Sequence, residues 1–363
     1  MKIALVCSWL NQYGGAERVL EALHDIFPEA PVYTSIYWPE AMPPAYRTWD
    51  IRTSFLDKLP LIKERHQPFL PLYPLAFEQF NFSEYDLVLS DSSAFAHGVI
   101  TPPHALHICY CLTPARFLWS YHQYIAGEGL GPLARALLPP FIYHLRLWDR
   151  AAADRVDFFA TISEVVRRRI AKYYHREAKV IPPPVDTESY LSSETIEDYF
   201  LIVSRLVPYK RIDIGVQAFN ELGLPLVIIG DGRDRMRLQA MAQPNIRFLG
   251  RLPDGEVRQY FARCRAFIFP GEEDFGISCV EAQAAGRPVI TYAGGGALET
   301  VEEGVSGTFF HQPMAASLAE AVRSFDPRSY NSAAIRRRAQ TFSIENFKVR
   351  MRSFIEEVKA DKE

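Results

Sequence analysis

The sequence lacks an excess of positive charge. Its 40 Lys and Arg residues are balanced by 43 Asp and Glu residues, which gives a formal net charge of −3 at pH 7. Proteins that bind nucleic acid generally carry a strong basic excess, so this balance argues against that class. Low-complexity runs and repeats of short fixed period are also missing. The 363 residues, 48% of them hydrophobic, therefore indicate an ordinary globular protein of about two domains.

The sequence has few cysteines, and they lack the spacing of a disulfide framework or of a metal site. They are Cys7, Cys109, Cys111, Cys264 and Cys279. Their number is odd, no two form a C-x-x-C pair, and no cluster of Cys and His has the spacing of zinc ligands. Most of them lie in apolar segments that resemble strands or helices. We therefore expect reduced, buried thiols in a cytoplasmic protein, and no metal site.

A long apolar run at the start is missing as well. The opening run MKIALVCSWL is too short for a transmembrane helix, and an amphipathic pattern follows it instead of a cleavage site. The most basic segment, residues 134–180, contains the mixed run ALLPPFIYHLRLWDR. Two interpretations stay open for that run. It is either an amphipathic helix against the core, or a surface that touches anionic lipid at the inner membrane face or a lipid-phosphate acceptor.

What the first half does contain is a regular alternation of apolar strands and amphipathic helices. The pattern predicts a helix over 16–27 and strands over 2–8, 31–37, 85–93, 105–114 and 157–164. The first strand is apolar at almost every position, as in a parallel strand covered on both faces. Ser163 is placed to cap the helix that follows the last of these strands. The proline-rich run AKVIPPPVD at 178–186 closes this half.

The alternation restarts after a polar segment, Ser192 to Tyr199, which has no core pattern. We expect strands at 199–206, 225–232, 245–252, 266–271 and 288–296, with helices between them. This alternation is typical of a doubly wound parallel sheet, whose ligands bind at the carboxyl ends of the strands. The last segment, from Ser343, predicts a helix with one apolar stripe. We expect that helix to pack back on the first domain.

The predicted fold class is therefore α/β, with two Rossmann-like doubly wound domains facing across a cleft. We expect an N-terminal, acceptor-side domain at 1–190, a linker at 191–199 and a C-terminal domain at 200–342. Residues 343–363 are expected to form the returning helix.

The stretch FPGEEDFGISCVEAQAAGRPVIT, Phe269 to Thr291, places acids around a glycine turn between a strand and a helix. A helix that begins near Gly276 offers unpaired N–H groups and the positive end of its dipole to a ligand. Glu273 precedes this helix and Glu281 lies about one turn inside it. Two carboxylates at that range suit neighbouring hydroxyls, as on a ribose or a hexose. The alternative is that both are solvated; Glu272 and Asp274 are expected to be so.

Two further turns carry polar chemistry. In SRLVPYKR, Arg205 and Lys210 lie at a strand end, where two cations suit a diphosphate. In YGGAERV, Gly14 and Gly15 allow backbone to approach a phosphate or a sugar. This second motif is not G-x-G-x-x-G, and no acid stands at the right place after a second strand, so nicotinamide cofactor binding is poorly supported.

Together these motifs resemble the large retaining glycosyltransferase family of GT-B fold with an E-x7-E motif (glycosyltransferase family 4, group 1). That family includes phosphatidylinositol mannosyltransferases, sucrose-phosphate synthases and bacterial polysaccharide mannosyltransferases. The resemblance rests on Glu273-x7-Glu281, on Arg205 and Lys210, and on the first glycine turn. FLGRLPDGEV and AGGGALETVEEGVSGTFF add to it. It covers nearly the whole chain and is strongest over 200–311.

The resemblance implies a nucleotide-sugar donor, GDP- or UDP-linked, bound as a substrate and without a separate cofactor. It assigns Glu281 to the ribose, Glu273 to the donor sugar, and Arg205 and Lys210 to the diphosphate. The other binding positions that it implies are Gly14, Gly15, Gly250, Arg251, Leu252, Phe275, Gly276 and Ile277. Arg205, Lys210 and Glu273 would be catalytic, and the two cations would take the part that a metal ion plays elsewhere. Attack on the same face of the sugar, with the departing phosphate as base, would retain the anomeric configuration.

One position departs from the pattern. Relatives that read CYCHTP carry a histidine near the reacting sugar, and this sequence reads CYCLTP with Leu112 there. His97, in SSAFAHGV, is a candidate for contact with the sugar or acceptor, with a structural role as the alternative, which is the more common one for a lone His. Arg116 would grip an acceptor phosphate, with a surface ion pair as its alternative.

The function predicted from the sequence is transfer of a hexose, with mannose from GDP-mannose preferred, to a saccharide or lipid-linked acceptor in cell-surface polysaccharide or glycolipid synthesis. A nucleotide-sugar epimerase of similar fold is a second hypothesis, but it explains the Glu273 and Glu281 pair less well. A non-catalytic nucleotide-sugar binder is a third, which Leu112 keeps open.

Overall fold

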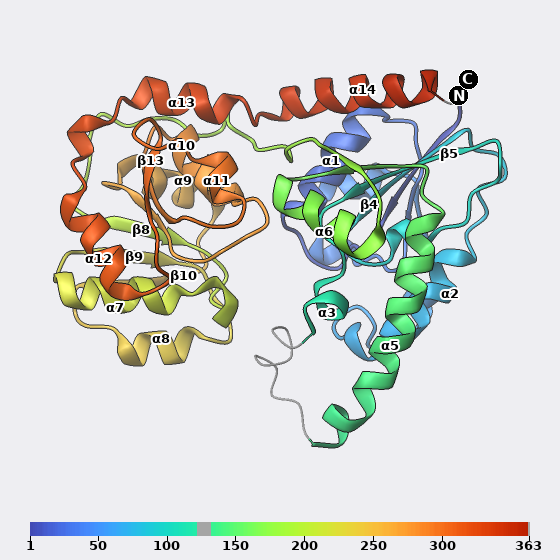
Figure 1. Cartoon of the computed structure of the whole chain (residues 1–363), viewed down its shortest axis with the longest axis horizontal. Helices are drawn as coiled ribbons and strands as arrows, with labels where there is room; N and C mark the ends of the chain where they lie inside the picture. Colours follow the sequence, from blue (N-terminus) through green and yellow to red (C-terminus); the bar gives the residue numbers. More distant parts are fainter. Residues whose placement is uncertain (122–131, 362–363) are drawn as a thin grey trace. The chain divides into compact units, whose positions relative to one another are not determined.

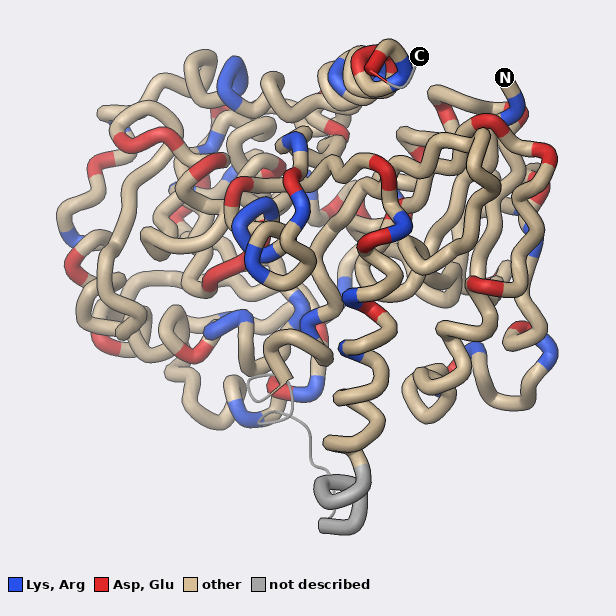
Figure 2. The backbone as a smooth tube through the Cα atoms, turned by 45° about the vertical axis from the view of Figure 1, so that its right-hand side comes forward, with Lys and Arg blue, Asp and Glu red and all other residues tan. Residues whose placement is uncertain are grey.

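The computed structural model describes residues 1–121 and 132–361, which form two compact units (Figure 1). Unit 1 comprises Met1–Pro183 and Phe347–Glu363, and unit 2 comprises Pro184–Asn346. Lys and Arg alternate with Asp and Glu along the backbone of both units (Figure 2). This mixture agrees with the near-neutral charge balance of the sequence.

Unit 1 is built on a seven-stranded sheet, in which every pair of neighbouring strands is parallel, with the order β3-β2-β1-β4-β5-β6-β7. Its strands are β1 (Ile3–Cys7), β2 (Val32–Thr34), β3 (Ile51–Thr53), β4 (Leu87–Ser92), β5 (Leu106–Cys111), β6 (Phe158–Thr161) and β7 (Ala178–Val180). The chain runs one way from β1 through β3 and the other way from β4. The topological switch point therefore lies between β1 and β4, where such sheets bind ligands. The predicted doubly wound α/β class is confirmed for this unit.

The helices of unit 1 follow from apolar stripes and from caps. They are α1 (Gly15–Ile26), α2 (Tyr73–Glu78), α3 (Arg116–Trp119), α5 (Pro132–Asp154), α6 (Glu164–Tyr174) and α14 (Ile344–Ala360), with short 3-10 turns η1 (Pro39–Ala41), η2 (Pro44–Thr48), η3 (Phe55–Lys58), η4 (Gln67–Leu72) and η5 (Ala96–Gly98). The Ser163 side chain accepts a hydrogen bond from the Val166 N–H and caps α6, as predicted.

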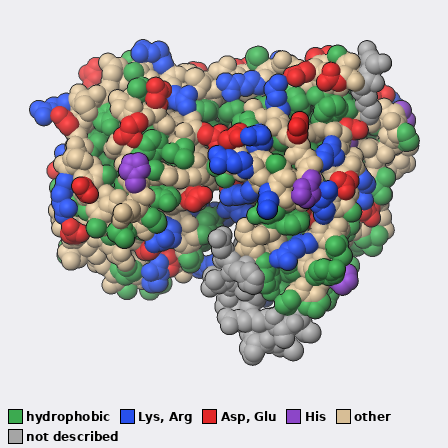
Figure 3. All heavy atoms as spheres, viewed as in Figure 1, with side chains coloured by type: hydrophobic (Ala, Val, Ile, Leu, Met, Phe, Trp, Pro, Cys, Tyr) green, Lys and Arg blue, Asp and Glu red, His purple; other side chains and the backbone are tan. Residues whose placement is uncertain are grey.

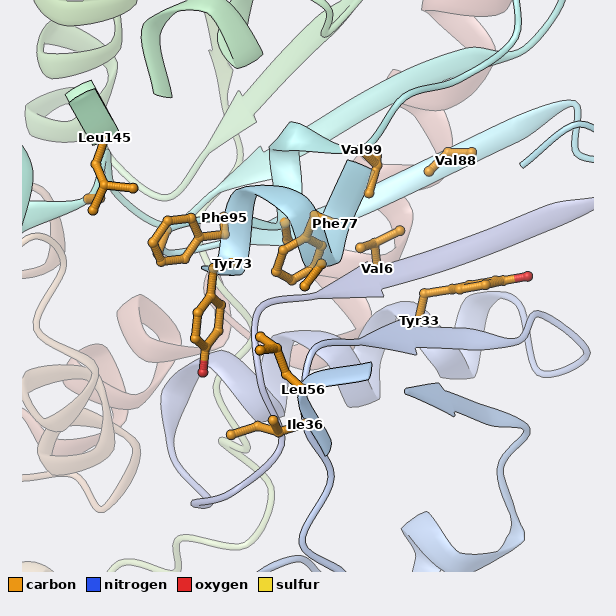
Figure 4. Close-up of a cluster of buried hydrophobic side chains, with 14 of the residues drawn as sticks. Val6, Tyr33, Ile36, Leu56, Tyr73, Phe77, Val88, Phe95, Val99 and Leu145 are labelled. Atoms are coloured by element: carbon orange, nitrogen blue, oxygen red, sulfur yellow. The ribbon is translucent and has the colours of Figure 1, made fainter. Parts of the chain in front are cut away.

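An aromatic core covers one face of this sheet. Val6 of β1 and Val88 of β4 point into a cluster that contains Tyr73, Phe77 and Phe95 (Figure 4). These three aromatic side chains are at most 1% exposed. Burying each of them contributes roughly 1.5–3 kcal/mol relative to leaving it in water, so this cluster fixes the edge from which the β1 and β4 loops leave.

Unit 2 repeats the architecture with a six-stranded parallel sheet in the order β10-β9-β8-β11-β12-β13. Its strands are β8 (Phe200–Val203), β9 (Leu226–Ile229), β10 (Ile246–Gly250), β11 (Phe267–Phe269), β12 (Val289–Tyr292) and β13 (Gly307–Phe310). The switch point lies between β8 and β11, which pair at Leu201 and Phe267. The loops after these two strands therefore leave the sheet side by side.

Helices cover both faces of this second sheet, with α7 and α8 on one side and α9 and α10 on the other (Figure 1). The helical elements are η6 (Pro208–Lys210), α7 (Ile212–Leu222), α8 (Arg235–Met241), α9 (Asp254–Arg263), α10 (Ile277–Ala284), α11 (Ala297–Thr300), α12 (Ala315–Ser324), η7 (Pro327–Ser329) and α13 (Ser332–Gln340). Helix α7 ends where Gly223 takes a φ of +66°, the left-handed conformation that glycine adopts at little cost.

The last helix belongs to unit 1, as predicted. Its apolar stripe, Phe347, Met351, Phe354, Ile355 and Val358, is buried. The Phe347 ring lies 5.4 Å from the Tyr110 ring of β5, and Lys348 Nζ lies 3.0 Å from Asp25 Oδ2 of α1. Hydrophobic burial therefore holds this helix against the first sheet.

The boundary between the units differs from the expected linker at 191–199. The division falls between Pro183 and Pro184, and the polar segment is part of unit 2. Glu197 donates its N–H to the Arg263 carbonyl at 2.7 Å, and Asp198 pairs with Arg265 at 2.9 Å. Backbone hydrogen bonds and ion pairs hold this segment, so it needs no apolar pattern.

All five cysteines are free and buried, which confirms the expectation of small buried thiols. Across residues 1–121 and 132–361, no helix has the length and apolar character needed to cross a membrane.

Candidate active site

The centre of the site in unit 2 is the pair of loops that follow β8 and β11. The first loop carries Lys210 at the end of η6, and the second carries Glu273. Lys210 Nζ and Glu273 Oε1 form a close ion pair, with side chains 14% and 20% exposed. Because the two strands are neighbours, residues far apart in the sequence meet at the same edge of the sheet. The structure thus brings together two of the three residues predicted to be catalytic.

The two loops also touch through their backbones. A Cβ at Gly271 would lie 2.5 Å from the Lys210 carbonyl oxygen, a distance that no side chain tolerates. Glycine at this position therefore has a packing reason: it lets the β11 loop approach the backbone that carries the lysine.

Helix α10 begins directly after these acids. Its N-cap, Gly276, has a φ of +88°, and no side chain caps it. The positive end of the helix dipole and its first N–H groups, from Ile277 onward, are the predicted contacts for donor oxygens. Phe275 is 3% exposed, and its ring lies 5.5 Å from the Phe342 ring, so only its backbone is available for such a contact.

Glu281 lies inside α10 and is only 9% exposed. Burial raises the pKa of the neighbouring Cys279 thiol, Glu273 and Glu281 raise it further, and Lys210 lowers it. All three charges therefore lie within electrostatic range of one buried sulfur. Glu273 thus pairs with Lys210 just before α10, and Glu281 lies in the second turn of that helix.

Asp274 differs from expectation. It was predicted to be solvated, but it is 5% exposed, whereas Glu272 is exposed as predicted. The next glycine turn explains this, because it lies over the acidic loop. The Gly296 N–H donates to the Glu273 carbonyl at 2.8 Å, and a Cβ at Gly295 would collide with that carbonyl. The AGGG turn after β12 thus holds the backbone of Glu273 in place and covers Asp274.

Arg205 lies in the same loop as the lysine. Its guanidinium donates to the Tyr209 hydroxyl at 2.8 Å, and Lys210 Nζ lies 5.5 Å from the centre of the Tyr209 ring. Tyr209 therefore links the two cations and is itself 45% exposed.

Gly250 is the last residue of β10, and Arg251 and Leu252 follow it on the same edge of the sheet. The Gly230 N–H donates to the Gly250 carbonyl at 2.7 Å, and Gly250 has a φ of +73°. A Cβ at Gly230 would collide with the Ser204 carbonyl. The loops after β8, β9 and β10 are therefore packed backbone to backbone. The structure places these three positions on the predicted edge; their contact with a base stays a prediction.

In unit 1, Gly14 is the N-cap of α1, and Gly15 is its first residue. The Glu17 carboxylate accepts a hydrogen bond from the Gly14 backbone, which is the reciprocal half of a capping box. Burial raises the pKa of Glu17 to about 7, although this hydrogen bond and one from its own backbone lower it. Sequence reasoning did not single out Glu17, although an acid three residues after an N-cap is a known signal.

His97 is buried. It is 2% exposed, and its Nδ1 lies 3.1 Å from Ser92 Oγ. Its Nε2 lies 3.4 Å from Asp149 Oδ1, and Asp149 also accepts hydrogen bonds from Trp119 and Tyr174. Burial lowers the pKa of His97. Burial in a network that joins β4, α3, α5 and α6 supports the structural alternative for His97.

Arg116 is the first residue of α3 and is partly exposed. Its contact with an acceptor phosphate stays a prediction.

Comparison with known proteins agrees with this geometry. Residues 13–189 match the model of Glycosyltransferase Family 4, and residues 190–340 match that of Glycosyl transferases group 1. The crystal structure of Anabaena HepE in complex with UDP superposes with a TM-score of 0.73 at 18% identity, covering 98% of this chain and 100% of that one. The sucrose-phosphate synthase of Thermosynechococcus elongatus has a TM-score of 0.74 at 16% identity, covering 99% and 100%. The two family models together match residues 13–340, and the fold is that of the GT-B structures.

A relative of this chain is the GDP-mannose-dependent alpha-(1-6)-phosphatidylinositol monomannoside mannosyltransferase of Mycobacterium tuberculosis. The two are 29% identical over 225 residues, which cover 53% of this chain and 56% of that protein. The chain thus spans about half the length of this curated relative.

Tyr209 and the AGGG turn are the features of the unit 2 site whose roles sequence reasoning missed. In the sequence, the AGGG turn served only as part of the resemblance to the family. Its glycines, at positions where a side chain would collide with the backbone of Glu273 or Phe275, could have been a signal of close packing. For Tyr209 the sequence holds no signal beyond its place between two cations.

Proposed function

We propose that this glycosyltransferase moves a hexose from a nucleotide-sugar to a hydroxyl of a saccharide or lipid-linked acceptor, with retention of anomeric configuration. The observation that carries the proposal is the ion pair of Lys210 and Glu273 next to the N-terminus of α10, the helix that also carries Glu281. In a nucleotide-sugar, the cation and the helix N-terminus suit the negatively charged phosphates, and the two carboxylates suit the hydroxyls.

In this proposal Arg205 and Lys210 bind the diphosphate and stabilise the charge that grows on it as the sugar leaves. Because these cations neutralise the leaving group, the proposed reaction needs no metal ion. Glu281 binds the ribose hydroxyls. Glu273 binds hydroxyls of the transferred sugar. The hydrogen bond from the Gly296 N–H to the Glu273 carbonyl positions the backbone of this glutamate.

The ion pair between Lys210 and Glu273 gives the donor-free site a defined starting arrangement. Each partner prevents the other from being left as an unpaired, largely buried charge. We infer that donor binding exchanges this pair for two new ones, lysine with phosphate and glutamate with hydroxyl. With Glu273 so engaged, attack from the same face with the departing phosphate as base is the proposed route to retention.

The proposed donor is GDP-mannose. Support comes from the mycobacterial relative, which is named as a GDP-mannose-dependent mannosyltransferase. The HepE structure contains UDP, so UDP-glucose is the competitor to test. The proposed setting is cell-surface polysaccharide or glycolipid synthesis in the cytoplasm.

The proposal is tested by incubating the protein with GDP-mannose or UDP-glucose, with and without a lipid-linked or mannoside acceptor. Acceptor-dependent release of GDP supports transfer. Isomerised sugar without acceptor would instead indicate an epimerase, and donor binding without turnover on any acceptor would indicate a binding protein. A thermal-shift screen identifies the donor first, since a bound donor raises the unfolding temperature by mass action.

We further propose that helix α5 touches the membrane that carries the acceptor. Tyr143 and Leu147, one turn apart on the same side of α5, are 58% and 54% exposed, and Figure 3 shows hydrophobic side chains at the surface in this region. Exposed aromatic and aliphatic side chains on one helix suit insertion at a lipid interface. Leu147→Ser should weaken co-sedimentation with anionic vesicles. Leu191→Ser, which changes an equally apolar residue that is 72% exposed, should leave it unchanged.

A further inference from the structure

A cavity of about 270 Å³ lies at the amino ends of the strands of the second sheet. Its lining includes Tyr199, Pro225 and Asn245, the residues that directly precede β8, β9 and β10. The loops that carry Lys210 and Glu273 leave the opposite, carboxyl edge of the same sheet. Because the four residues of β8 span roughly 13 Å, the cavity is separate from the proposed donor site.

The way in which helices cover the sheet explains why the cavity exists. Helix α9 packs against β8, and α7 packs against β10 on the other face (Figure 1). Arg247 of β10 is in register with Val227 of β9, so their side chains lie on the same face of the sheet. Both residues line the cavity together with Tyr260 of α9. A single water needs only roughly 10–15 Å³ of such space, so the cavity has room for a small organic molecule.

Three acceptor oxygens belong to residues of the cavity wall. Asn245 Nδ2 donates to the carbonyls of Phe219 and Leu224, at 2.9 and 2.7 Å, which fixes the side chain of this asparagine. Glu197 and Asp198 each accept a hydrogen bond from an arginine through one oxygen, at 3.1 and 2.9 Å. Among the described residues, nothing donates to Asn245 Oδ1, to Glu197 Oε2 or to Asp198 Oδ2. These oxygens are therefore available to a ligand.

The wall also carries a cation. Arg247 is exposed, and within residues 1–121 and 132–361 it forms no ion pair or hydrogen bond. The mixture of charges selects the kind of ligand, because an anion would meet two carboxylates and a cation would meet Arg247. A neutral hydroxyl suits both, since it donates to the carboxylates and accepts from the guanidinium. Val227 and Tyr260 add the apolar surface that small-molecule sites provide for the carbon skeleton of a ligand.

We propose that this cavity binds one neutral hexose unit, as a second saccharide site apart from the place of the transfer reaction. The inference rests on the proposed function for the identity of the ligand as a unit of a saccharide chain. The site itself rests on the cavity and on its available donors and acceptors. A chain bound there stays associated with the protein between transfers, which raises its effective concentration for the next one.

The test uses the full chain labelled with ¹⁵N, methyl α-D-mannopyranoside as the neutral probe and mannose 6-phosphate as the anionic one. TROSY NMR is recorded in the presence of GDP, which fills the proposed donor site. We expect methyl mannoside to shift the amide signals of Asn245, Arg247 and Tyr260 in a saturable manner. The Kd should rise about tenfold in Arg247→Ala, the loss expected for one charge-assisted hydrogen bond. Arg337→Ala, which removes another exposed arginine of unit 2, is the matched control and should leave the Kd unchanged.

A second variant separates a hydroxyl site from an anion site. Asp198→Asn keeps the shape of the side chain and removes its charge, so it should weaken binding of methyl mannoside. Tighter binding of mannose 6-phosphate in Asp198→Asn, lost in Arg247→Ala, would show an anion site and overturn the inference. Absence of shifts at the three amides, or an equal Kd in Arg247→Ala and the unchanged protein, would also overturn it.

Failure of this inference is distinguishable from failure of the proposed function. If transfer occurs and methyl mannoside leaves the three amides unshifted, the saccharide site is wrong and the transferase is right. If no donor is turned over but methyl mannoside shifts these amides in an Arg247-dependent manner, the site stands without the transferase. Arg247→Ala should keep the kcat and the donor KM of the unchanged protein, because the proposed donor residues lie at the opposite edge of the sheet.

Discussion

Lys210 Nζ forms an ion pair with Glu273 Oε1, 63 residues further along the chain. The pair exists because β8 and β11 are neighbours at the switch point of the second sheet, so their following loops share an edge. Gly271 permits the loops to touch, and the AGGG turn fixes the backbone of the glutamate. The lysine and the glutamate are thus positioned before a donor arrives, which is what electrostatic stabilisation of a leaving group requires.

Removing the lysine should abolish most turnover. Lys210→Ala leaves the departing diphosphate without its nearest proposed charge, and we expect kcat to fall by about 10²–10³. The adjacent Arg211 pairs with Asp213 and serves as the matched control. Steady-state nucleotide release should show near-normal kcat for Arg211→Ala. Comparable losses in both variants would mean that general positive charge, and not this lysine, matters.

The acid inside α10 should affect donor affinity more than chemistry. Glu281→Ala removes the proposed ribose contact, which is made equally in the ground state and the transition state, so the donor KM should rise more than kcat falls. Glu272→Ala is the control, because Glu272 is exposed in the loop before α10; its donor KM should stay unchanged. The proposed role is lost if initial-rate kinetics give an unchanged donor KM for Glu281→Ala.

The contact between the two loops is tested at Gly271. In Gly271→Ala the new methyl group would lie 2.5 Å from the Lys210 carbonyl, so the lysine must move. We expect a lower unfolding temperature and about a tenfold or greater loss of kcat/KM, as for other small displacements of catalytic groups. A Cβ at Gly255 in α9, by contrast, would meet no atom of the described residues within 4 Å. Gly255→Ala should be neutral or stabilise by about 0.5–1 kcal/mol, through helix propensity.

Glu17 makes stability depend on pH. Burial raises its pKa from 4.5 to about 7 in the folded protein, so the folded state binds more protons between these values. Stability therefore falls as pH rises through that window and stays reduced above pH 7. Glu17→Gln removes this penalty and should stabilise the protein at pH 8 by at most about 3 kcal/mol, with little effect near pH 4.

Urea unfolding midpoints at the two pH values measure the Glu17 effect. The nearby acids Glu21 and Asp91 are present in both proteins, so the comparison isolates the exchanged side chain. A Glu17→Gln difference that is the same at pH 4 and pH 8 would show that this carboxyl does not titrate with a raised pKa.

Much of the fold could be predicted from the sequence, because it depends on periodic apolar patterns. The strand ends, and with them the edge that carries Arg205, Lys210, Glu273 and Glu281, follow from those patterns. The ion pair does not, because a strand end fixes where a backbone lies but not which charge a long side chain meets.

The sequence could not predict burial that distant residues create. His97 contacts Asp149, which lies 52 residues away, and the local sequence SSAFAHGV does not predict that partner. Asp274 is covered by a turn that comes after the next strand. Backbone hydrogen bonds and ion pairs hold the 191–199 segment to unit 2, and such interactions cannot be predicted from the hydropathy of the sequence.

The most direct test of the central claim is the configuration of the product. Incubation with GDP-mannose and a mannoside acceptor, followed by ¹H NMR of the new anomeric signal, distinguishes transfer with retention from every alternative. We predict one new α-linked mannosyl signal for each GDP released, with both lost in Lys210→Ala. A β-linked product, or GDP release without any new glycosidic signal, would contradict the account.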